Sequence, residues 1–109
     1  MIFITARFRV QSTYADQWPD IARDFTRATR AESGCLWFFW NRSLDDPTEY
    51  VLVEAFRDEQ AGAEHVQSEH FKTAQRTLPP YLVETPRVVN TMVDQDDWSL
   101  LGEMSVANE

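Results

Sequence analysis

The segment 54–71, EAFRDEQAGAEHVQSEHF, holds the residues of this chain whose types and spacing best suit chemistry, two histidines among several carboxylates. Zinc motifs such as H-E-x-x-H place two histidines four residues apart, so that both imidazoles lie on one face of a helix and reach one ion. His65 and His70 are five residues apart. On one continuous helix this offset turns the second side chain by roughly 140° from the first. The spacing argues against a shared metal ion, and no metal site is predicted.

Glu54 and His65 are instead predicted to form a catalytic pair that exchanges protons. Glu54 lies between Leu52 and Phe56 on one face of a predicted strand, and apolar neighbours raise the pKa of a carboxyl group toward neutrality. His65 ends the following helix and returns toward the sheet, where it could pair with Glu54 and keep one ring nitrogen for a substrate. A structural alternative is equally open, in which Glu54 pairs with His65 or an arginine only to pin the helix to the strand.

Aromatic side chains could line a flat cavity for an aromatic substrate, because ligand pockets are mostly apolar with a few polar anchors. Trp40 and Phe56 lie near strand ends and are the predicted wall of this cavity, with Phe71 as a further substrate contact. Phe25 belongs to the apolar stripe of a helix and is assigned to packing. His70 is kept as a candidate substrate contact, although a place at the surface or at a dimer edge is the favoured interpretation.

The elements that position these residues follow from the apolar periodicity. Alternation with a period of two, or dense β-branched and aromatic content, predicts strands over 2–10, 35–44, 49–56 and 87–95. Amphipathic stripes and capping residues predict helices over 14–28, 58–66 and 68–78, with a break near Gln67.

The order β-α-β-β-α-β is that of the α+β ferredoxin-like fold, an antiparallel sheet with two helices on one face. Residues 1–94 are predicted to form this domain. Residues 95–109 are predicted to form a tail that either docks on a partner subunit or frays.

The strand over 35–44 carries apolar bulk on both of its faces. Simple alternation places Leu36, Phe38 and Trp40 on one face and Cys35, Trp37 and Phe39 on the other. A monomer would leave one of these sets in water, and exposed aromatic patches of that size usually mark an interface. The sequence therefore predicts a homodimer joined through the helix-free face of the sheet.

Composition excludes several classes of partner. The net charge of −8 and the pI near 4.6 repel phosphate backbones and anionic lipids, so neither nucleic acid nor a membrane is expected as a partner. The apolar start of the chain is interrupted by Arg7 and Arg9, which favours a cytoplasmic protein without a signal peptide. The three glycines do not form a phosphate-binding loop, so NAD, FAD and ATP are not expected and no cofactor is predicted.

Two segments, TRAESGCLWF and VLVEAFRDEQAGAEHVQSEHFKTAQ, resemble the antibiotic biosynthesis monooxygenase family of the dimeric α+β barrel superfamily. The resemblance implies a dimeric α/β barrel built from ferredoxin-like subunits. Members include cofactor-independent monooxygenases of quinols and polycyclic phenols, haem-degrading enzymes, and an isomerase of a phosphorylated quorum-signal derivative. Haem-degrading members carry Asn, Trp and an iron-ligating His at the positions that correspond, by this resemblance, to Arg7, Phe56 and Gln75 of this chain. Because the His ligand is replaced, haem degradation is not expected.

The predicted function is therefore that of a cofactor-independent monooxygenase that uses a small aromatic substrate, a quinol or polycyclic phenol, and O2. A deprotonated phenol or quinol can pass an electron to O2, so the protein needs only a base and a dry cavity. Two alternatives remain: an isomerase of a small carbonyl compound that uses the same Glu/His pair, and a non-catalytic dimeric module that binds a small molecule. Oxygen uptake separates the first from the second, and binding without turnover would indicate the third.

Overall fold

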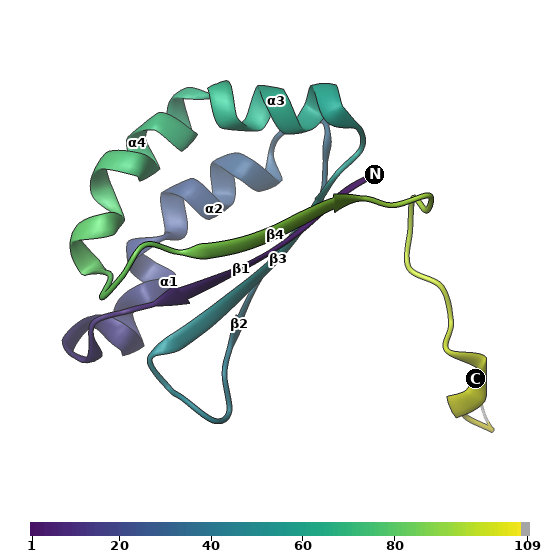
Figure 1. Ribbon diagram of the computed structural model, residues 1–109, viewed down its shortest axis with the longest axis horizontal. Helices are drawn as coiled ribbons and strands as arrows, with labels where there is room; N and C mark the ends of the chain where they lie inside the picture. Colours follow the sequence, from purple (N-terminus) through teal and green to yellow (C-terminus); the bar gives the residue numbers. More distant parts are fainter. Residues whose placement is uncertain (108–109) are drawn as a thin grey trace.

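The computed structural model describes residues 1–107 and places four antiparallel strands in one sheet with the helices on one face (Figure 1). The strands are β1 (Ile2–Arg9), β2 (Cys35–Arg42), β3 (Glu49–Phe56) and β4 (Arg87–Met92). Their order across the sheet is β2-β3-β1-β4. The predicted α+β ferredoxin-like architecture is confirmed. No helix in the described part of the chain is long and apolar enough to cross a membrane.

The predicted helix over 14–28 is divided into three pieces. A 3-10 helix, η1 (Ser12–Gln17), leads into the single turn α1 (Trp18–Ile21), which is followed by α2 (Arg23–Arg30). Pro19 lies in the first turn of α1, where backbone N–H groups make no hydrogen bond within the helix, so the absence of an N–H group at Pro19 costs nothing. Trp18 at the start of α1 is fully buried, so the apolar side of the segment still packs in the core although the helix is divided.

Capping residues begin α3 (Glu59–Gln67) and α4 (Glu69–Thr77), and the second of them lies at the break between the two helices. The Asp58 carboxylate accepts a hydrogen bond from the backbone N–H of Ala61 and begins α3. Ser68 has an extended backbone, and its hydroxyl accepts from the backbone N–H of Phe71 to begin α4. The break that the sequence predicts near Gln67 therefore lies at Ser68. Two 3-10 turns follow, η2 (Pro79–Tyr81) and η3 (Gly102–Met104).

A β-bulge in β2 changes which side chains share a face. Cys35 pairs with Phe56, and Trp37 already pairs with Ala55, so Leu36 is the additional residue. Cys35 therefore packs on the helix side with the cluster that contains Phe38. The simple alternation that placed Cys35 opposite Phe38 is wrong for this residue, because one inserted residue reverses the phase of a strand.

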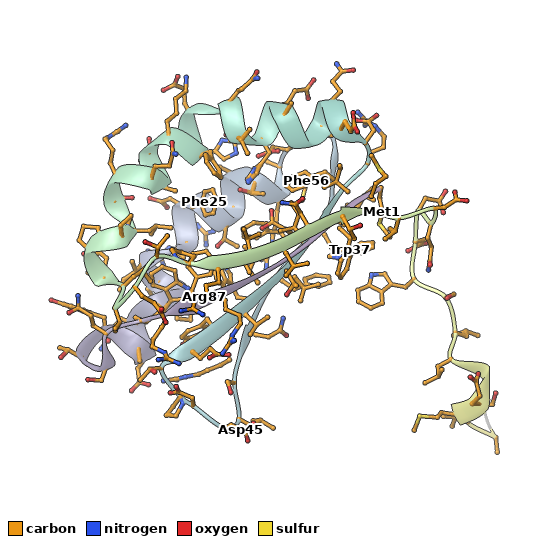
Figure 2. All side chains as sticks on the ribbon, viewed as in Figure 1. Met1, Phe25, Trp37, Asp45, Phe56 and Arg87 are labelled. Carbon is orange, nitrogen blue, oxygen red and sulfur yellow. The ribbon has the colours of Figure 1, made fainter. Side chains whose placement is uncertain are left out.

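The helix-free face of the sheet retains exposed apolar side chains. Phe39 is 45% exposed and Val89 is 66% exposed. Trp37 is buried beneath Trp98 of the C-terminal segment, with ring centroids 5.1 Å apart (Trp37 is labelled in Figure 2). Beyond this contact the segment leads away from the sheet (Figure 1), and its large apolar residues Leu100, Leu101 and Met104 are exposed. The predicted tail boundary at residue 95 falls shortly after β4, and residues 108–109 lie outside the described chain.

Candidate functional site

Glu54 and His65 lie together between the sheet and the helices. Glu54 projects from β3 toward the helices and is 6% exposed, while His65 lies in the last turn of α3 and is 3% exposed. The Nε2 atom of His65 lies 3.8 Å from Oε1 of Glu54. This separation exceeds the usual length of a direct hydrogen bond. The predicted pair is thus assembled, with a gap between its two polar atoms.

The other ring nitrogen of His65 is bound by Glu32, which the sequence analysis did not identify as a site residue. Nδ1 of His65 lies 2.8 Å from Oε2 of Glu32, and Nε2 of His70 contacts the same oxygen. Because a carboxylate only accepts hydrogen bonds, Glu32 holds the proton of His65 on Nδ1. In the neutral imidazole, Nε2 then carries the lone pair and faces Glu54.

Gly34 explains how Glu32 reaches α3. A Cβ atom at Gly34 would lie 2.3 Å from the Cβ of Ala61. The loop before β2 can therefore approach α3 this closely only because Gly34 has no side chain. The carbonyl oxygen of Gly34 also accepts from the backbone N–H of Arg57 at 2.8 Å. These contacts bring the loop that carries Glu32 against the helix that carries His65.

The spacing argument against a shared ligand is wrong for His65 and His70. It assumed one continuous helix, whereas the break at Ser68 places the two histidines on different helices that both face Glu32. One donor atom from each of the three residues lies within 4.8 Å of the others, so the group could hold a metal ion. In this structure the carboxylate oxygen itself bridges the two nitrogens by hydrogen bonds.

Burial sets the protonation states of the pair. Desolvation raises the pKa of Glu54 to about 7, and the nearby charge of Glu32 raises it further in the same direction. Desolvation lowers the pKa of His65, although the hydrogen bond and charge of Glu32 oppose that change. Near neutral pH, Glu54 therefore exchanges its proton readily while His65 is neutral.

The pair faces a cavity of about 600 Å³ between the sheet and the helices. This volume lies within the range of small-molecule sites. Its lining is mostly apolar. It comes from the strands β1, β3 and β4, the helices α2, α3 and α4, and the segment between α4 and β4. The apolar lining residues include Ile4, Ala6, Phe25, Leu52, Phe71, Leu78 and Val88. Phe25, which the sequence analysis assigned to packing, is part of this wall (labelled in Figure 2).

The predicted aromatic contacts are only partly brought to the cavity. Phe71 lines it, but Trp40 and Phe56 do not. The indole N–H of Trp40 donates to the hydroxyl of Thr26, and its ring packs in the core. Phe56 is fully buried and stacks on the His65 ring with centroids 4.7 Å apart. The predicted wall of Trp40 and Phe56 is therefore corrected, because Trp40 packs against Trp18 and α2, and Phe56 packs against His65 of α3.

His70 binds Glu32 and does not line the cavity. Its side chain is 25% exposed, which is between a buried and a surface position. Its contact with Glu32 gives it a role in holding that carboxylate, which spacing alone could not indicate.

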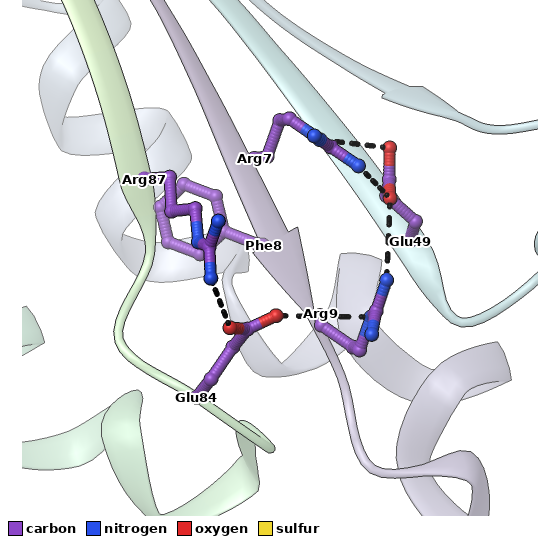
Figure 3. A pocket seen from close by; sticks show the side chains of 6 residues that line it. All are labelled: Arg7, Phe8, Arg9, Glu49, Glu84 and Arg87. Atoms are coloured by element: carbon purple, nitrogen blue, oxygen red, sulfur yellow. Dashed lines mark hydrogen bonds and ion pairs between the residues drawn. The ribbon is translucent and has the colours of Figure 1, made fainter.

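A second hollow, of about 190 Å³, has a different character (Figure 3). Its charged side chains form ion pairs with one another: Arg7 with Glu49 at 2.9 Å, and Arg87 with Glu84 at 3.4 Å. The hydrogen bond from Arg7 keeps the pKa of Glu49 below its usual range. This hollow lacks the apolar interior that an aromatic ligand requires, so the larger cavity is the candidate site.

Comparison with known proteins identifies the family of the chain. The antibiotic biosynthesis monooxygenase family profile matches residues 1–77, about seven tenths of the chain. The chain belongs to this family. The match includes Glu32, Glu54, His65 and His70, but ends before β4. No protein of curated function matches the chain.

Solved structures share the fold across most of the chain. A Nitrosomonas europaea protein assigned to the same family is 23% identical, with a TM-score of 0.79 over 87% of this chain and 100% of that one. A protein from Mycobacterium tuberculosis is 26% identical, with a TM-score of 0.77 over 90% and 98% of the two chains. A Deinococcus radiodurans protein assigned to the family reaches 0.80 at 16% identity over 92% and 99%. At these identities the similarity establishes the architecture, and the chemistry must be argued from the site.

Proposed function

We propose that this protein is a cofactor-independent monooxygenase that oxidises a quinol or polycyclic phenol with O2. The observation that carries the proposal is the Glu54–His65 pair at the buried end of an apolar cavity of about 600 Å³. Membership of the antibiotic biosynthesis monooxygenase family supports a monooxygenase-like role. The cavity supports a flat aromatic ligand, since its walls offer Phe25 and Phe71 together with aliphatic side chains.

The gap between the two polar atoms suits a substrate hydroxyl group. A hydroxyl oxygen makes hydrogen bonds of about 2.7–2.9 Å. Two such distances together exceed the 3.8 Å between Nε2 of His65 and Oε1 of Glu54, so one oxygen can contact both atoms. The lone pair on Nε2 or the ionised form of Glu54 can then accept the phenolic proton.

The proposed reaction converts the phenol and O2 into a quinone and water. After the proton passes to the pair, the phenolate transfers one electron to O2, and the resulting carbon radical and superoxide combine to form a C–O bond. The pair returns a proton to the peroxide anion. Loss of the ring C–H proton and cleavage of the O–O bond then release one oxygen atom as water, while the other remains as the new carbonyl. The four electrons accepted by O2 come from the bonds broken in the substrate.

Glu32 and Phe56 act on the pair without facing the substrate. Glu32 keeps the proton of His65 on Nδ1, so that Nε2 is the basic atom. Phe56 stacks on the ring and limits its rotation. Both are positioning residues, because a base must be held within hydrogen-bond reach of the proton that it removes.

Oxygen uptake with a dihydroxynaphthalene probe tests the proposal. The wild-type protein should consume one O2 for each quinone formed, and Glu54→Gln and His65→Gln should each lower the rate by roughly 10²- to 10⁴-fold. Glu64→Gln is the matched control, because Glu64 is exposed on α3 and does not line the cavity. Full activity in both site variants would exclude the assignment.

The same pair could move a proton beside a carbonyl group, as in the isomerase alternative. Glu54, with a pKa of about 7, is suited to that transfer as well. Turnover of a carbonyl compound without oxygen uptake would favour the isomerase. Tight binding of aromatic probes without any turnover would instead favour a binding module.

We also propose that the protein is a homodimer joined through its helix-free sheet face. Phe39 and Val89 are exposed on this face. Apolar side chains gathered on one exposed sheet face are typical of an interface, so a second copy placed on this face would remove them from water.

A further inference from the structure

The cavity has polar groups at two separate places. Glu54 and His65 occupy the buried place, and the amide-bearing residues Asn90 and Gln75, together with Thr85, line the cavity elsewhere. Both amide residues are exposed, whereas Glu54 and His65 are almost fully buried. Asn90 and Gln75 therefore lie toward the open side of the cavity, between the edge strand β4 and helix α4.

Strand register gives the separation between Glu54 and Asn90. Ile4 of β1 pairs with Glu54 of β3 on one side and with Asn90 of β4 on the other. The three side chains therefore form a row on the helix-facing side of the sheet. Adjacent strands lie about 4.8 Å apart, so the backbones at Glu54 and Asn90 are separated by roughly 10 Å. Ile4 forms the apolar floor between them.

The amides are available to a ligand. Within residues 1–107, neither the Asn90 nor the Gln75 side chain forms a hydrogen bond to another protein group, although both line the cavity. A primary amide offers both a carbonyl acceptor and two N–H donors, and it carries no charge. It can therefore bind a neutral hydroxyl or carbonyl oxygen of a ligand.

We infer that Asn90 and Gln75 form a second oxygen-binding subsite, so that the ligand is a planar fused-ring compound with oxygen functions at both ends. This inference rests on the proposed function for the role of the first oxygen, which lies between Glu54 and His65. The apolar middle of the ligand packs on Ile4, Phe25 and Phe71, and the second oxygen binds the amides at the open side. A ring compound with one oxygen packs against the same apolar walls but makes no hydrogen bond with the amides.

Anaerobic binding separates this inference from the oxidation. The probes are 2,6-dihydroxynaphthalene, with hydroxyl groups at opposite ends, and 2-naphthol, with one hydroxyl group. Without O2 neither probe is oxidised, so tryptophan fluorescence titration measures affinity alone. The wild-type protein should bind the diol about 2- to 12-fold more tightly, since one net hydrogen bond contributes about 0.5–1.5 kcal/mol. A smaller preference in the wild-type protein would overturn the inference.

The variants then locate the preference. The double variant Asn90→Leu/Gln75→Leu should bind 2-naphthol with wild-type affinity and lose the preference for the diol. Gln60→Leu, which removes an exposed amide of α3 outside the cavity, should retain it. The single variants Asn90→Leu and Gln75→Leu provide the same comparison if the double variant does not fold. An undiminished preference in the double variant, or in both single variants, would overturn the inference.

The two proposals fail in different ways. If the protein does not consume O2 with either probe but shows the amide-dependent preference, the monooxygenase proposal fails and the second subsite remains. If it oxidises both probes and the Leu variants keep the preference, the subsite fails and the oxidation remains. Failure of the wild-type protein to bind either probe would overturn the subsite.

Discussion

Nδ1 of His65 lies 2.8 Å from the carboxylate of Glu32, although 33 residues separate them along the chain. This contact decides which nitrogen of the imidazole is basic. It also gives Glu54 a negatively charged neighbour that raises its pKa. Glu32 therefore links the orientation of one member of the pair to the protonation of the other.

Glu32→Gln should reduce kcat about 10- to 100-fold while the protein stays folded, as expected when the carboxylate that orients a functional histidine is lost. The loss of the Glu32 charge should also lower the pKa of Glu54, and the acidic limb of the pH–rate profile should move to lower pH. Nitrogen-15 NMR of His65 should show a loss of the uniform Nδ1–H tautomer. An unchanged pH profile and tautomer would show that Glu32 has only a packing role.

Glu54→Gln should stabilise the protein at alkaline pH although it should lower activity. The folded-state pKa of Glu54, about 7, exceeds its ordinary value of 4.5. Its contribution to stability is therefore complete below about pH 4.5 and is lost as the pH rises through about 7. The upper limit of that loss is about 3 kcal/mol, because a tenfold change in proton affinity corresponds to about 1.4 kcal/mol.

Urea denaturation at pH 5 and at pH 8.5 measures this effect. The free energy of unfolding of Glu54→Gln, relative to wild type, should rise between the two pH values by up to about 3 kcal/mol. Exposed Glu64 is the control, and Glu64→Gln should show little change in the same comparison. A difference that stays constant with pH would mean that Glu54 is not protonated at neutral pH.

Gly34→Ala should destabilise the fold, because the new Cβ would lie 2.3 Å from the Cβ of Ala61. The cost should be about 1–3 kcal/mol, typical of overpacking in a close contact. Gly62→Ala is the matched comparison, because its Cβ meets only Ile2 at 3.9 Å and Gly62 lies inside α3. That substitution should stabilise the protein by up to about 1 kcal/mol through helix propensity. Thermal melting that ranks the two variants in the opposite order would contradict the packing described around Gly34.

The elements of the fold could be predicted because their signals are local. The caps at Asp58 and Ser68 are residues with short polar side chains before apolar stripes, and both bind the backbone as their types suggest. The bulge at Leu36 could not be predicted in the same way. Its strand is apolar on both faces, so a slip of one residue leaves no polar side chain in the core to reveal it.

Glu54 and His65 of the candidate site could be predicted from the sequence, but Glu32 could not. Glu54 and His65 belong to consecutive elements, so their approach follows from the strand-to-helix connection. Glu32 belongs to a different connection, and its contact depends on the tertiary approach of Gly34 to Ala61. Strand ends also misled the choice of Trp40 and Phe56, since position along a strand does not reveal which side chains the helices cover.

The proposed assembly through the helix-free face depends on the apolar side chain of Phe39. If a second copy covers this face, Phe39→Glu should convert the dimer to a monomer, because a charge buried in an apolar interface loses its hydration without gaining a partner. Light scattering should give twice the 12.7 kDa chain mass for the wild-type protein and the single-chain mass for the variant. Leu44→Glu is the control, since Leu44 is fully exposed in the β2–β3 hairpin loop, and it should remain dimeric. A wild-type protein that is monomeric at micromolar concentration would rule out this interface.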